Sequence, residues 1–98
     1  MLALYVESGS IMTRIQPDAK PTDDAVKQLN ADELAWERKV TDWLATNLGL
    51  AARERFLEPP SLPYASYGAD SRVNATLNRL ANRRSNLTNL IETSAYDQ

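Results

Sequence analysis

A regular spacing of apolar residues near the C-terminal end of the chain constrains its fold more than any other feature. Between residues 72 and 92, apolar side chains recur at alternating steps of four and three, and one position of the series holds an arginine. The six positions, which we call the seam, are Val73, Leu77, Leu80, Arg84, Leu87 and Ile91. Because heptad spacing aligns side chains along one stripe, it predicts a helix over about 71–94. We expect this stripe to pack on another helix of the chain, and it also offers a surface for self-association.

A second amphipathic pattern precedes the seam and predicts the helix that packs on it. Thr22, followed by two aspartates, is one candidate N-terminal cap, and Asn30, followed by Glu33, is another. Gly49 indicates the C-terminal end, so the helix is predicted over about 23–48. The large apolar residues of its inner stripe are the predicted core anchors: Trp36, Val40, Trp43 and Leu44.

These elements predict a mainly α fold, in which two long helices form an antiparallel hairpin within a small bundle. A short third helix is expected over 50–57. The proline-rich stretch 58–70 that follows is unable to continue as a regular helix. Because it contains Leu62, Tyr64 and Tyr67, we expect it to form a loop that packs against the helices.

Residues 1–21 are expected to form an extended arm and linker ahead of a helical domain that spans 22–98. The run LALYV is apolar and strand-like, ESGS has a turn composition, and IMTRI alternates, so the pattern favours a β-hairpin within the arm. A two-stranded hairpin is marginally stable in water, so the arm needs a surface on which to dock. The expected docking residues are Leu2, Leu4, Val6, Ile11 and Ile15.

Arg84 is the one charged member of the seam, and its position requires a partner. An unpaired guanidinium inside a helix interface costs several kcal/mol. In an antiparallel hairpin, Arg84 lies near the level of Trp36 and Glu37 on the facing helix. We therefore expect Arg84 to pair with Glu33 or Glu37, or to stack on Trp36. Such a pair would set the register of the helices at some cost in stability.

Asparagines and arginines follow the predicted C-terminal helix beside the seam. These polar and basic positions are Arg72, Asn74, Asn78, Arg79, Asn82, Arg83 and Asn86. Asparagine is a mediocre helix former, so its repetition at steps of four indicates bonds along the helix or to another polar surface. A solvated face is the simpler interpretation. A polar interface to a neighbouring subunit is one alternative. A nucleic-acid interface is another, because arginines hold phosphates and asparagine reads adenine.

Composition excludes several classes of chemistry. The 98 residues contain no cysteine and no histidine, which removes thiolate sites, the commonest zinc ligand and the commonest general base. We therefore expect no catalytic residue, no metal site and no cofactor. The net charge of −2 does not favour nucleic acid or acidic membranes. The chain has no signal-peptide pattern and no apolar run of membrane-spanning length, so we expect a cytoplasmic location, or a virion.

The sequence therefore predicts a non-catalytic protein–protein interaction or assembly protein. It would be a small subunit or adaptor of a larger complex, such as a minor phage or virion component, and would form homo- or hetero-oligomers. Two alternatives stay open: a small nucleic-acid-binding regulator that uses the arginine and asparagine face, and a monomeric inhibitor of one host protein. Neither a membrane nor a small-molecule substrate is expected as a partner.

Overall fold

The computed structural model describes residues 2–13, 21–59, 63–66 and 70–96, with side chains described as far as Thr93. Most of these residues belong to helices, and no strand occurs among them. The helices are α1 (Leu2–Met12), α2 (Asp23–Asn47), α3 (Leu50–Phe56) and α4 (Ser71–Tyr96). The predicted mainly α fold with two long helices and a short third one is confirmed. No helix in the described part of the chain is both long enough and apolar enough to cross a membrane.

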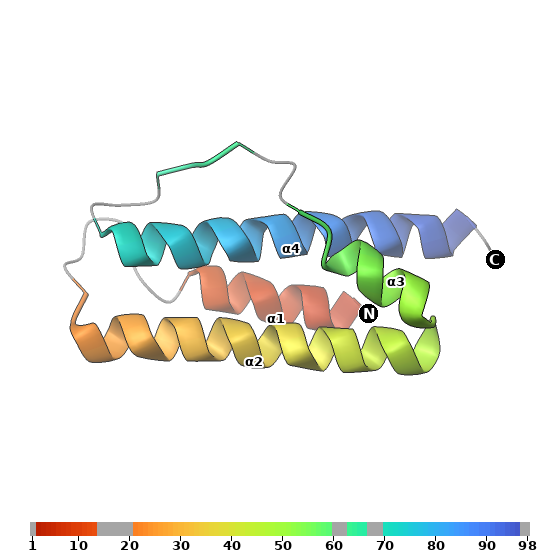
Figure 1. The fold of residues 1–98 in the computed structure, drawn as a ribbon, viewed down its shortest axis with the longest axis horizontal. Helices are drawn as coiled ribbons and strands as arrows, with labels where there is room; N and C mark the ends of the chain where they lie inside the picture. Colours follow the sequence, from red (N-terminus) through yellow and green to blue (C-terminus); the bar gives the residue numbers. More distant parts are fainter. Residues whose placement is uncertain (1, 14–20, 60–62, 67–69, 97–98) are drawn as a thin grey trace.

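The two long helices run side by side in the same direction, so the predicted antiparallel hairpin is wrong (Figure 1). The ion pairs between them rise in residue number together: Asp23 with Arg72, Glu33 with Arg79, and Glu37 with Arg83. α1 packs against both long helices and runs in the opposite direction, and α3 packs against both near one end (Figure 1).

The connection between α3 and α4 is what permits the parallel arrangement. The 26 residues of α4 span about 39 Å at 1.5 Å per residue. Residues 57–70 reach roughly 45 Å when extended at about 3.3 Å per residue, which is enough to return the chain to the start of the bundle. Helices joined by short loops are antiparallel neighbours, and the length of this connection removes that constraint. We call residues 57–70 the return connection.

α2 begins at the first of the two predicted caps. Thr22 is extended, and its side chain accepts a hydrogen bond of 3.1 Å from the Ala25 amide. Asp23 and Asp24 occupy the first turn, where their charge complements the helix dipole. Asn30 is therefore an interior residue of α2 and not its cap. Gly49 ends the helix as predicted, with a φ of 94° that favours glycine.

The core lies where α1, α2, α3 and α4 meet. Its buried apolar residues include four seam positions, three of the predicted anchors and one residue of α3: Val73, Leu77, Leu80, Leu87, Trp36, Val40, Leu44 and Phe56. Ile91 and Trp43 are only partly buried. The Trp36 and Phe56 rings meet edge to face, with centroids 5.7 Å apart. The apolar side chains of the seam thus pack within their own chain.

The extended arm predicted for the N-terminus is instead the helix α1, so the β-hairpin is wrong for residues 2–12. A short apolar run is compatible with either a strand or a buried helix. Residues 2–12 form a helix, which packs against the two long helices. The expected docking residues divide accordingly. Ile11 is buried and Leu4 partly buried, whereas Leu2 and Val6 are 65% and 62% exposed. Ile15 lies outside the described residues.

The described part of the predicted packed loop is exposed. Residues 63–66 all lie at the surface, and the Tyr64 side chain does not contribute to the core, being 69% exposed. Leu62 and Tyr67, the other residues expected to pack, lie outside the described residues. The packed-loop prediction is therefore wrong for Tyr64.

Candidate functional site

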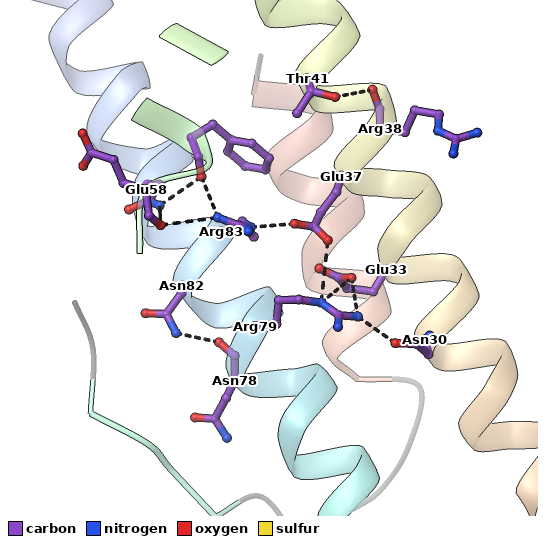
Figure 2. A network of polar contacts seen from close by, with 12 residues as sticks. Asn30, Glu33, Glu37, Arg38, Thr41, Glu58, Asn78, Arg79, Asn82 and Arg83 are labelled. Atoms are coloured by element: carbon purple, nitrogen blue, oxygen red, sulfur yellow. Dashed lines mark hydrogen bonds and ion pairs between the residues drawn. The ribbon is translucent and has the colours of Figure 1, made fainter. Parts of the chain in front are cut away.

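A network of four charged side chains joins α2 to α4 (Figure 2). α2 supplies Glu33 and Glu37, one turn apart, and α4 supplies two arginines with the same spacing. Arg79 Nη2 lies 2.7 Å from Glu33 Oε2, and Arg83 Nε lies 2.5 Å from Glu37 Oε1. Arg79 also donates to Asn30 Oδ1 at 2.7 Å. In the parallel arrangement each glutamate lies at the same height along the bundle as its arginine. The two negative and two positive charges therefore neutralise one another within the interface.

Glu33 is the member of this network that is most fully removed from water. Its side chain is fully buried, and its Oε1 atom has no hydrogen-bond partner among the described residues. Burial removes the carboxylate from water and raises the pKa of Glu33 to about 7, against the opposing effect of its bond with Arg79. The neighbouring Glu37 raises this pKa further. The bundle therefore holds a carboxyl group that gains or loses its proton near neutral pH.

Glu33→Gln is expected to make the protein more stable than the wild type at neutral and alkaline pH. Because the folded-state pKa is raised, the contribution of Glu33 to stability is fully present below pH 4.5 and is lost as the pH rises through about 7. The shift corresponds to at most ~3 kcal/mol in the free energy of unfolding. Urea denaturation between pH 4.5 and about 8 measures the difference between the two proteins.

The control for this experiment is Glu92→Gln, which replaces an exposed glutamate of α4. Its stability curve should run parallel to that of the wild type. If the wild type and Glu33→Gln show the same dependence on pH, Glu33 does not titrate in this range.

Arg84 does not pair with Glu33 or Glu37 and does not stack on Trp36, so the prediction for its partners is wrong. Its guanidinium turns to α1, where it lies 4.6 Å from the centre of the Tyr5 ring. Its Nε donates to Ser8 Oγ at 2.9 Å, and its Nη1 lies 3.0 Å from Met12 Sδ. A helical α1 occupies the third side of the bundle, which an extended arm would leave open.

The asparagines beside the seam hold the return connection against α4. Asn78 accepts a bond from the Ala65 amide at 2.8 Å and donates to the Ala65 carbonyl at 2.7 Å. Asn86 donates to the carbonyls of Phe56 and Glu58 at 3.0 and 3.4 Å. Asn82 donates back to the Asn78 carbonyl. These amides satisfy backbone groups along the helix and in the connection, so the interpretation of a solvated face is wrong for Asn78 and Asn86.

The arginines of the proposed nucleic-acid face are all engaged by carboxylates. Arg72 pairs with Asp70 at 2.9 Å and with Asp23 at 2.8 Å. The Arg72 guanidinium, together with backbone amides at the start of α4, lowers the pKa of Asp70 to about 2. Arg79 and Arg83 belong to the network described above. A phosphate backbone would have to compete with these carboxylates for each arginine.

A pocket of about 420 Å³ lies between the return connection and α4. Its apolar residues are Leu57, Pro59, Tyr64 and Ala75. Its polar residues are Glu58, Asn78, Arg79, Asn82 and Arg83. Apart from the length of the connection, no feature of the sequence indicates this pocket.

The side of α1 that faces away from the bundle is uncharged. This outer face consists of the exposed residues Leu2, Ala3, Val6, Ser10 and Thr13. The one charged residue of α1 is Glu7, which lies to the side and pairs with Lys39 of α2 at 2.7 Å. Leu2 and Val6, its two large apolar side chains, lie one turn apart and are both exposed.

Among the described residues, no group of three acidic side chains is placed to hold a metal ion. The Glu33–Arg79 and Glu37–Arg83 pairs join the two long helices, and Asn78 and Asn86 hold the return connection. Comparisons of the chain with protein-family models, with curated proteins and with solved structures find no match.

Proposed function

We propose that this protein is a non-catalytic assembly subunit whose contact surface is the outer face of α1, and that the first partner of this surface is a second copy of the chain. The observation that carries the proposal is the exposure of Leu2 and Val6, at 65% and 62%, on a helix that is apolar on its inner side as well. A helix that is apolar nearly all round is typically buried on every side.

The outer face is complementary to itself. When two α1 helices pack antiparallel about a two-fold axis at Val6, Leu2 of one copy lies opposite the partner's Ser10. A large side chain thus meets a small one on each side of the axis. A two-fold contact also places each residue near the axis beside its own copy, and an uncharged face avoids the repulsion that this would cause.

The contact is small, which sets the expected affinity. Three turns of helix cover less than the roughly 1,200–2,000 Å² buried in a stable interface. We therefore expect a dimer that forms in a concentration-dependent manner, with a dissociation constant of about 10 µM or weaker. Because the contact is apolar, added salt should not dissociate the dimer.

Val6→Glu is expected to abolish self-association. A glutamate at the centre of the two-fold contact would face its own copy, and the exposure of Val6 means that folding does not depend on it. Light scattering from ~10 µM to ~1 mM, at low and high salt, measures the mass. The wild type should approach the mass of a dimer, and the variant should remain a monomer.

Leu34→Glu is the matched control, because Leu34 is an exposed apolar residue of α2 at 49%. This variant should associate like the wild type. A wild type that remains a monomer at the highest concentration would contradict the proposal, as would a Val6→Glu protein that dimerises normally.

A further inference from the structure

The pocket beneath the return connection is held open at both ends. Near one end, the Asn78 amide makes two bonds with the backbone of Ala65. Near the other, Asn86 and Arg83 donate to the carbonyls of Phe56 and Glu58. These bonds fix the distance from α4 to the described parts of the connection at Glu58 and Ala65, so the space that these parts enclose with α4 is preformed. Its volume of about 420 Å³ lies in the range of small-molecule sites, roughly 300–1,000 Å³.

The parts of the lining side chains that face the pocket are mainly apolar. Leu57 and Tyr64 are among the large apolar side chains that remain exposed, at 40% and 69%, and both line this pocket. Arg79 and Arg83 also line it, but the Arg79 guanidinium turns toward the carboxylates of α2 (Figure 2). The Arg83 guanidinium lies between Glu37 and the carbonyls of Phe56 and Glu58. The aliphatic stems of both arginines are therefore the parts available to the pocket.

The charges around the pocket disfavour an ionic ligand. Each guanidinium is engaged by Glu33 or Glu37, so neither offers a free positive charge to an anion. Glu58 also lines the pocket and adds a negative charge that repels anions. Glu58 is exposed, so water screens its attraction for a cation. An uncharged molecule needs no ionic partner in the pocket and covers the exposed apolar side chains. The Tyr64 ring favours an aromatic molecule.

We propose that the pocket between the return connection and α4 binds a small, uncharged aromatic molecule, which packs between Tyr64, Leu57 and Ala75. This site is separate from the outer face of α1, and neither proposal depends on the other. A ligand here would stabilise the return connection, because it binds to the folded arrangement only.

The test uses the fluorescence of N-phenyl-1-naphthylamine, an uncharged aromatic probe that brightens in apolar surroundings. The wild type should bind one probe per chain with a dissociation constant of about 1–100 µM. Ala75→Phe places a ring in the pocket from an exposed position of α4 and should weaken binding at least about tenfold. Ala35→Phe, the same change at an exposed position of α2 that does not line the pocket, should leave binding unchanged.

Three further measurements decide between this site and others. Tyr64→Ala, which removes one wall without adding bulk, should also weaken binding. Val6→Glu should not, and loss of binding in that variant would assign the probe to α1 and overturn the proposal. The anionic analogue 1-anilinonaphthalene-8-sulfonate should bind at least about tenfold more weakly, and equal binding would overturn the uncharged class. A wild type without saturable binding, or an Ala75→Phe protein that binds normally, would overturn the site itself.

Discussion

Replacing Arg79 with methionine is expected to lower the free energy of unfolding by roughly 2–4 kcal/mol at about pH 8. The methionine keeps most of the volume of the stem but leaves the buried Glu33 carboxylate without its ion pair. Fully buried pairs lose about 3–5 kcal/mol when one partner is removed. The Arg79 side chain is 36% exposed, so solvent screening reduces the effect.

The loss should shrink as the pH falls. Below about 7 the folded wild type already holds Glu33 in its protonated form, so less charge is left unpaired when the arginine is removed. At about pH 5 we expect a loss near 1 kcal/mol, from the hydrogen bonds alone. Urea denaturation at the two pH values measures both quantities.

Arg72→Met is the control, because Arg72 is also ion-paired on α4 but is 53% exposed and lies near the surface. It should cost much less stability than Arg79→Met, because water screens the charges of an exposed ion pair. The double variant Arg79→Met with Glu33→Gln should recover most of the stability at alkaline pH. An Arg79→Met protein that loses no more than Arg72→Met, or that loses the same amount at both pH values, would contradict the assignment of this network.

Trp36→Ala is expected to cost about 3–5 kcal/mol, a large part of the 5–15 kcal/mol that stabilises a typical domain. Trp36 is 1% exposed and contacts the ring of Phe56 in α3. Its indole Nε1 donates to the Leu4 carbonyl of α1 at 2.7 Å. The substitution therefore leaves a cavity where three helices meet. Circular dichroism during urea denaturation should show an earlier transition.

Trp43→Ala is the matched control for that experiment. The sequence places both tryptophans on the inner stripe of α2, but the structure leaves Trp43 only partly buried. We expect a loss of roughly 1–2 kcal/mol at this position. Equal losses in the two variants would mean that Trp43 is packed as tightly as Trp36.

The partners of the arginines show where prediction from the sequence was limited. Helix spacing identified Glu33 and Glu37 as acceptors of an arginine on the facing helix, and that relation is observed. The arginines that bind them are Arg79 and Arg83, whereas Arg84 turns to α1. The predicted level was close, because Arg83, the neighbour of Arg84, pairs with Glu37. The error lies in the face of the helix, because Arg84 points to α1, which the sequence predicted as an extended arm.

The asparagines beside the seam and the length of the return connection together indicate how the two long helices are arranged. Amides at steps of four line one side of a helix, and a connection that runs the length of that helix has backbone groups to satisfy. Asn78 and Asn86 meet that need. Taken together, the two observations would have predicted a connection lying along α4 and, from it, parallel helices.

The sequence by itself determined the local structure of the long helices. Heptad spacing, the cap at Thr22 and the glycine at position 49 act over a few residues, so their effects can be read without knowledge of the fold. Only the tertiary structure decided the direction of α4 relative to α2, the helical form of α1 and the partner of Arg84. Each of these depends on which surfaces the chain brings together. The hydrophobic effect is non-directional, so an apolar stripe does not specify the direction of the helix that covers it. A short apolar run is compatible with a strand or a helix, and tertiary packing selects one of them.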